Sequence, residues 1–67
     1  MTSQEREILA FIEKNQPIAQ GTIRDHFPQW DIENILERLV SEKLVRRETH
    51  PTIQGKQDFY NERSRHD

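Results

Sequence analysis

The residues from 31 to 47 carry the clearest pattern of apolar and polar positions in the chain. Apolar side chains recur there at the three- and four-residue spacing of an α-helix and form one stripe: Ile32, Ile35, Leu36, Leu39 and Val40. Asp31 precedes the stripe, where its carboxylate can accept a backbone N–H and face the positive end of the helix dipole. The pattern therefore predicts an amphipathic helix that begins at Asp31 and ends near Lys43.

The opposite side of this helix is polar and carries Asn34, Glu37, Arg38 and Ser41. A helix with such a side could lie in the major groove of DNA. Asn34 suits adenine and Arg38 suits guanine, because each can make a bidentate contact with a base edge. Ser41 could contact bases or backbone, and Glu37 could accept from cytosine. The alternative is a solvated helix side with ordinary surface pairs, such as Asn34 with Arg38.

A first helix is predicted near the N-terminus. Thr2 and Glu5 have the spacing of a capping box, in which each side chain satisfies a backbone N–H of the first turn. Apolar residues follow at helical spacing: Ile8, Leu9, Phe11 and Ile12. Pro17 excludes continuation of the helix, so we expect it to end near Asn15 and Ile18 to make a short extended contact.

A second, shorter helix is predicted over Gln20–Phe27, with Ile23 and Phe27 facing inward. Pro28 stops it, and a tight turn leads to the next helix. A connection this short is typical of a helix-turn-helix. Trp30, at the end of the turn, is expected to fill the core between the two helices unless it is exposed to a partner.

After Lys43 the sequence changes to extended character. Residues 44–49 predict a strand, Pro51 and Gly55 mark a loop, and residues 57–61 can return as a partner strand. Phe59 or Tyr60 would then pack from the second strand onto the helices.

Basic residues in this region are candidate DNA contacts. The hairpin contributes Arg46, Arg47, His50 and Lys56, and the neighbouring helices contribute Arg24 and Lys43. Such cations would position a domain on phosphates or in the minor groove. Because side chains alternate along a strand, only one of the two adjacent arginines is expected to face DNA. The alternative is protection of an edge strand by charge.

Size and charge limit these interpretations. The 67 residues form one small domain, predicted over 1–61 with a flexible tail over 62–67, and there is no cysteine to add a disulfide. Twelve acidic residues against ten basic ones give a net charge of −2, which weighs against strong autonomous DNA binding unless a local patch outweighs the sum. No apolar run approaches the ~20 residues that span a bilayer, so we expect a cytoplasmic protein without membrane contact.

The residues of catalysis and cofactor binding are not recognisable in the sequence. His26, His50 and His66 lack the spacing of metal ligands, and Asp25 stands beside no plausible nucleophile. There is no glycine-rich phosphate loop. We therefore expect no enzyme activity, no cofactor, no metal and no small-molecule ligand.

The predicted order of elements resembles a winged helix-turn-helix domain over about residues 4–60. In particular, Leu36 and Leu39 followed by Leu44-Val45-Arg46-Arg47 are similar to the third helix and first wing strand of bacterial winged-helix transcriptional regulators, including the antibiotic-resistance and arsenic-repressor types. The resemblance implies an α+β, mainly α, fold: three helices plus a C-terminal two-stranded β-hairpin wing.

Two features depart from that pattern. Such families usually have a glycine just before the wing strand, where the helix closes with a left-handed residue, and this chain has Lys43. The third helix is also unusually acidic for a surface that meets phosphate: it carries Asp31, Glu33, Glu37 and Glu42.

The function implied by the resemblance is that of a sequence-specific transcriptional regulator that binds double-stranded DNA. Its third helix would enter the major groove and its basic wing would lie on the backbone, with a homodimer supported by first-helix residues such as Phe11. The acidic third helix favours an alternative, a winged-helix protein–protein interaction module within a larger complex that binds little or no DNA. Ile53, near the wing tip, could also contact a protein partner, because no core lies there.

Overall fold

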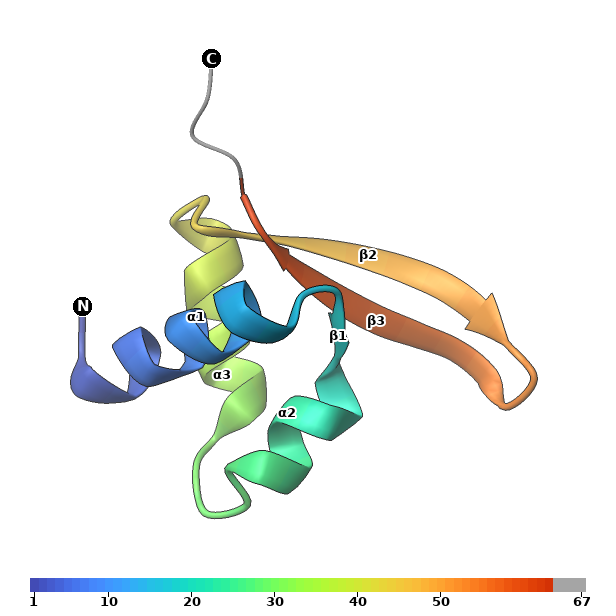
Figure 1. The fold of residues 1–67 in the computed structure, drawn as a ribbon, viewed down its shortest axis with the longest axis horizontal. Coiled ribbons are helices and arrows are strands. Elements are labelled where there is room, and N and C mark those ends of the chain that lie inside the picture. The colour runs from blue at the N-terminus through green and yellow to red at the C-terminus, as the bar shows by residue number, and fades with distance from the viewer. Residues whose placement is uncertain (64–67) are drawn as a thin grey trace.

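The computed structural model describes residues 1–63, which form three helices and three strands (Figure 1). In chain order the elements are α1 (Ser3–Asn15), β1 (Ile18–Ala19), α2 (Gln20–His26), α3 (Ile32–Ser41), β2 (Val45–Thr52) and β3 (Gly55–Glu62). The α+β class and the three helices are confirmed. No helix within residues 1–63 combines the length and the apolar character needed to cross a bilayer.

The sheet has three antiparallel strands rather than the expected two, in the order β1-β3-β2. The short extended contact predicted at Ile18 is a strand, because Ile18 pairs with Tyr60 and Ala19 pairs with Phe59. Among the described strands the last in chain order, β3, is therefore the central one, and it pairs with both β1 and β2.

The hairpin is also longer than predicted. Pro51, expected in the loop, lies within β2 opposite Lys56, and only Ile53 and Gln54 form the turn. A proline is tolerated there because β2 is an edge strand, where a missing N–H breaks no ladder on the open side.

At its other end, β3 continues one residue past the predicted domain boundary. Glu62 pairs with Val45, and the Arg63 N–H donates to the Leu44 carbonyl over 3.1 Å. The rest of the predicted tail, residues 64–67, lies outside the described residues.

The core lies between the three helices and the base of the sheet. Its fully buried side chains come from every layer: Ile8, Ile12, Ile23, Leu36, Leu39, Val45 and Tyr60. Of the two aromatic candidates on β3, Tyr60 enters the core and Phe59 is half-buried. Trp30 is half-buried, packs against this core and stacks on Phe27, with ring centroids 4.9 Å apart.

The helix ends follow the caps predicted from the sequence. The Thr2 hydroxyl accepts from the Glu5 N–H at 3.1 Å, and the Glu5 carboxylate accepts from the Thr2 N–H at 2.9 Å. The Asp31 carboxylate accepts from the first turn of α3. Helix α2 ends at His26, one residue before the predicted end, and Phe27 caps it by donating its N–H to the Ile23 carbonyl.

Lys43 has a φ of +64°, so it takes the left-handed conformation that glycine adopts most readily at the end of a helix. Its N–H donates to Val40 and the Leu44 N–H donates to Leu39, which satisfies the last carbonyls of α3. The α3–β2 junction thus has the expected geometry without the expected residue.

Candidate nucleic-acid interface

One side of α3 is left uncovered by the fold. The apolar stripe is buried or half-buried, whereas the predicted polar residues are all exposed: Asn34, Glu37, Arg38 and Ser41. The division of α3 into a buried and a polar side is thus confirmed.

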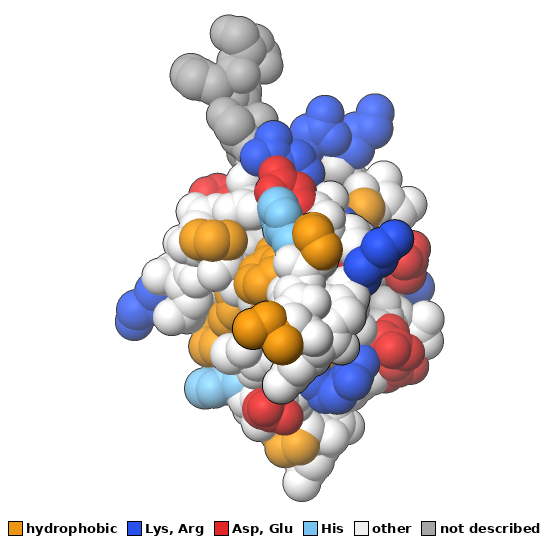
Figure 2. All heavy atoms as spheres, turned by 90° about the vertical axis from the view of Figure 1, so that its right-hand side faces the viewer, with side chains coloured by type: hydrophobic (Ala, Val, Ile, Leu, Met, Phe, Trp, Pro, Cys, Tyr) orange, Lys and Arg blue, Asp and Glu red, His pale blue; other side chains and the backbone are white. Residues whose placement is uncertain are grey.

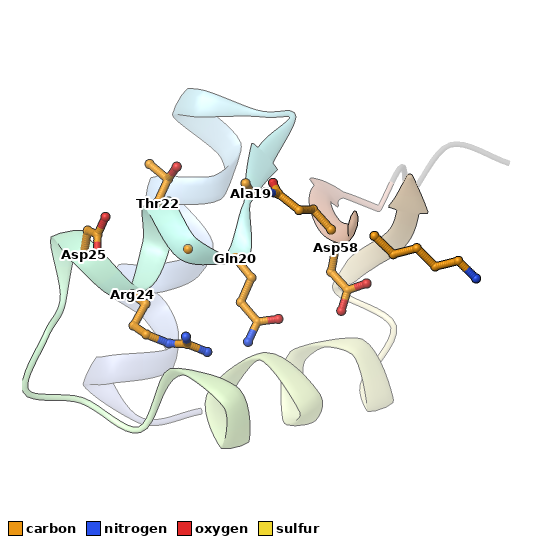
Figure 3. A pocket seen from close by; sticks show the side chains of 9 residues that line it. Ala19, Gln20, Thr22, Arg24, Asp25 and Asp58 are labelled. Carbon is orange, nitrogen blue, oxygen red and sulfur yellow. The ribbon is translucent and has the colours of Figure 1, made fainter. Parts of the chain in front are cut away.

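The uncovered side of α3 borders a groove against α2 and the hairpin. The groove contains two adjoining hollows of about 500 and 310 Å³, and Gln20 and Asp58 line both. Figure 3 shows Gln20 and Arg24 extending from α2 toward the open space that Asp58 reaches from β3. We call this the α2–α3–hairpin groove.

Arg24 is held at this groove by a carboxylate of α3. Its Nη2 atom lies 3.1 Å from the Glu33 Oε2 atom, and both side chains are more than half exposed, at 53% and 71%. An ion pair this exposed contributes little to stability, at most about 1 kcal/mol.

Arg47 occupies the centre of a hydrogen-bonded chain that joins four elements. Its Nη2 donates to Glu37 of α3 at 2.6 Å and its Nε donates to the Tyr60 hydroxyl at 3.1 Å. That hydroxyl in turn donates to Gln20 of α2 at 3.3 Å. The guanidinium also lies 5.6 Å from the centre of the Tyr60 ring, in cation–π range.

This hydrogen-bonded network changes the pKa values of two of its members. The hydrogen bond with Glu37 raises the pKa of Arg47 above its ordinary value, against an opposing effect of burial. Burial raises the pKa of Tyr60, while the hydrogen bond and charge of Arg47 work in the opposite direction. At neutral pH the Arg47 guanidinium is therefore charged and the Tyr60 hydroxyl is neutral.

Arg38 lies on the other side of α3, toward α1. Its Nε atom is 3.5 Å from an oxygen of Glu5, a residue that is only 4% exposed. Arg38 therefore offsets a buried negative charge in addition to facing solvent. It does not pair with Asn34, whose amide donates instead to Asp31 at 2.6 Å.

Arg46 and His50 lie on the face of the hairpin that points away from the groove, because strand residues alternate in direction. Both reach Glu48, each at 3.2 Å, and the His50 ring meets Phe59 edge to face at 5.5 Å. The prediction that Arg46 and Arg47 face opposite ways is confirmed.

The two candidate lysines are less constrained. Within residues 1–63, neither Lys43 nor Lys56 has a carboxylate within 4.0 Å, unlike the four candidate arginines. Lys56 lines the larger hollow of the groove, and Lys43 stands beyond the C-terminal end of α3, two residues after exposed Ser41.

The predicted site residues thus divide into separate groups. The groove collects Arg24, Asn34, Glu37, Arg47 and Lys56, whereas Arg38, Ser41, Lys43, Arg46 and His50 lie elsewhere. Sequence reasoning missed Gln20, Asp58 and the Tyr60 hydroxyl. The sequence contained one usable signal: Gln20 opens the predicted second helix, which in a helix-turn-helix adjoins the third.

Charges around the hairpin are mixed. Figure 2, which looks from the hairpin end, shows Lys and Arg side chains at several separate places with Asp and Glu side chains between them. Within residues 1–63 no group of His, Cys, Asp or Glu is arranged to hold a metal, and His26 stacks on Phe11 at 4.4 Å. His66 lies outside the described residues.

Comparison with known proteins gives no match: no family model fits the chain, and no curated protein or solved structure is significantly similar to it. A function must therefore be inferred from the groove and the hairpin themselves.

Proposed function

We propose that the chain is a winged-helix DNA-binding domain of a cytoplasmic transcriptional regulator. The observation that carries this proposal is the exposed polar side of α3, which borders a groove beside a hairpin projecting past the helices (Figure 1). In this proposal α3 enters the major groove and the hairpin is the wing that meets the DNA backbone.

Asn34 is the best-placed residue of α3 for reading a base. It borders both the groove and a hollow on the α1 side, so it lies in the middle of the exposed side. Its hydrogen bond to Asp31 orients the amide and leaves the carbonyl oxygen and the second N–H for the edge of adenine.

The hairpin offers basic side chains on both of its faces. Lys56 lines the groove, while Arg46 and His50 lie on the outer face. A hairpin placed in the minor groove meets one backbone strand on each side, so residues on opposite faces can both contact phosphate. One α3 presents a small surface, and the charges around it nearly balance. We therefore expect the regulatory unit to be two copies bound to adjacent half-sites on the DNA.

The test is a titration of a labelled, random-sequence DNA duplex with the purified protein, followed by selection of preferred sequences. We expect binding at about 50 mM salt. Three phosphate contacts would give a slope of log K against log salt of about −2.7. Lys56→Ala should weaken binding to all sequences, and Asn34→Ala should remove the preference at one position. Lys14→Ala, an exposed change on α1, is the control. No binding at about 50 mM salt would contradict the proposal.

A second candidate function is a protein–protein interaction module. It is favoured by the pairing of all four candidate arginines with carboxylates: Arg24 with Glu33, Arg38 with Glu5, Arg46 with Glu48 and Arg47 with Glu37. A surface neutralised in this way suits a mixed-charge protein partner better than a polyanion. Absence of DNA binding, together with a stoichiometric protein complex isolated from the source cells, would support this candidate.

A further inference from the structure

Two carboxylates of α3 hold both arginines that border the α2–α3–hairpin groove. Glu33 and Glu37 are one helical turn apart and therefore point to the same side of α3. Glu33 binds Arg24 from α2 at 3.1 Å, and Glu37 binds Arg47 from β2 at 2.6 Å. Each pair joins α3 to a different neighbouring element.

We propose that Glu33 and Glu37 are selectivity residues. They keep Arg24 and Arg47 paired and so withheld from phosphate, until a DNA base takes the place of the arginine as the partner of each carboxylate. This inference rests on the proposed DNA-binding function. A phosphate that approaches either arginine must compete with a carboxylate already in place. If the phosphate displaces that carboxylate, the carboxylate is left facing a polyanion, which is unfavourable by like-charge repulsion.

A matching base can offset that repulsion. The amino group of cytosine is a hydrogen-bond donor in the major groove, and glutamate or aspartate is the side chain that accepts from it. At a site with a suitably placed cytosine, the released carboxylate gains a donor while its arginine gains a phosphate. At other sites the carboxylate gains nothing, so the two glutamates weaken binding to non-matching DNA most.

The two ion pairs differ in how the arginine is anchored after release. Arg47 retains its hydrogen bond to Tyr60, so its Nη atoms stay oriented toward the groove. Arg24 is more than half exposed and has no second hydrogen-bond partner among residues 1–63. Because an oriented side chain loses less entropy on binding, removing the carboxylate should have a larger effect at Glu37 than at Glu33.

The test compares Glu33→Gln/Glu37→Gln with a control of equal charge change, Glu7→Gln/Glu62→Gln. The control residues are exposed and do not line the groove. Binding to a labelled random-sequence duplex is measured over a salt series. We expect the first variant to bind about tenfold more tightly, with a slope steeper by up to about 1.8, since two more arginines can each neutralise a phosphate. The control should change affinity by less than about twofold.

The single variants and the selected DNA sequence sharpen the result. Glu37→Gln should account for the larger share of the gain, and the double variant should discriminate less between selected and random duplexes. Equal gains in both double variants would show an effect of net charge alone and would overturn the inference. If the parent chain binds DNA and Glu33→Gln/Glu37→Gln binds it with the same affinity, the inference is overturned while the proposed function stands. Failure of the parent chain to bind would reject both proposals, whether or not the groove variant binds.

Discussion

The helical body and the outer half of the hairpin are stabilised in different ways. In the body, side chains from three helices and two strands are completely buried around Leu36 and Tyr60. In the hairpin, every residue from 49 to 56 is exposed, and the strands are held by ladder hydrogen bonds and by a Thr49–Asp58 side-chain bond of 2.6 Å. Burial therefore explains why the body folds, but it does not explain why the hairpin extends so far. Its length is available for contact with another molecule.

The largest expected effect separates the two regions directly. Leu36→Ala removes a fully buried side chain and should cost about 2–5 kcal/mol of unfolding free energy, enough to unfold much of a domain this small. Ile53→Ala, at the exposed turn of the hairpin, should leave stability unchanged within measurement error. Urea unfolding followed by circular dichroism measures both. A destabilised Ile53→Ala variant would mean that the hairpin tip packs against something in solution, such as a second copy.

A smaller effect is expected at the start of α1. Thr2→Ala removes one half of the capping box and should cost about 1 kcal/mol, because the Glu5 N–H loses its acceptor. Thermal unfolding measures the change, and Ser3→Ala, within the first turn but outside the capping box, serves as control. Equal melting temperatures for Thr2→Ala and the control would show that the cap does not contribute.

The junction between the two regions should be improvable. Lys43→Gly places glycine at a φ of +64°, which relieves a left-handed strain of about 1–2 kcal/mol and restores some unfolded-state entropy. The net result should be a gain of about 0.5–1 kcal/mol in the unfolding free energy. Lys56→Gly, in a strand, should instead destabilise the hairpin. A loss of stability in Lys43→Gly would show that the lysine side chain makes a contact that outweighs the strain.

The smallest effect is a titration at the base of the hairpin. The chain has one tyrosine, so near-ultraviolet tyrosinate absorbance reports Tyr60 alone. Its pKa should lie above 10.0, and Arg47→Met should raise the pKa further, because Arg47 favours the ionised hydroxyl. Arg46→Met, on the opposite face, should leave it unchanged. Identical titrations in both variants would contradict the Arg47–Tyr60 contact.

The same shift has a consequence for stability. Since folding favours the neutral hydroxyl, the unfolded chain loses this proton first as pH rises. The contribution of Tyr60 is therefore complete below pH 10 and declines as the pH rises toward the folded-state pKa. Unfolding midpoints measured on both sides of that pH check the sign.

Most of the body could be predicted from the sequence because its signals are local. Helical spacing of apolar residues defined α1 and α3, and Thr2, Glu5 and Asp31 marked where those helices begin. The third strand was recognisable only as an extended contact at Ile18. Its pairing with Tyr60 joins residues 42 positions apart, which no local pattern encodes.

The candidate site was less predictable for the same reason. The sequence identified the exposed residues of α3 and the alternation of Arg46 and Arg47. It did not identify which carboxylate each arginine binds, since Arg47 meets Glu37 only after α3 and β2 have packed together. The contribution of Gln20 and Tyr60 to the groove likewise depends on side chains from different elements meeting in space.

The strand order has a consequence for the nascent chain. Because β3 leaves the ribosome after every other element, β1 and β2 emerge with no partner in the sheet. Tyr60, a fully buried residue, is also added only after all three helices have been made. The core therefore cannot close until residue 60 has emerged, and a chain that stalls or is cut before Phe59 would expose the apolar sides of its helices to chaperones and proteases.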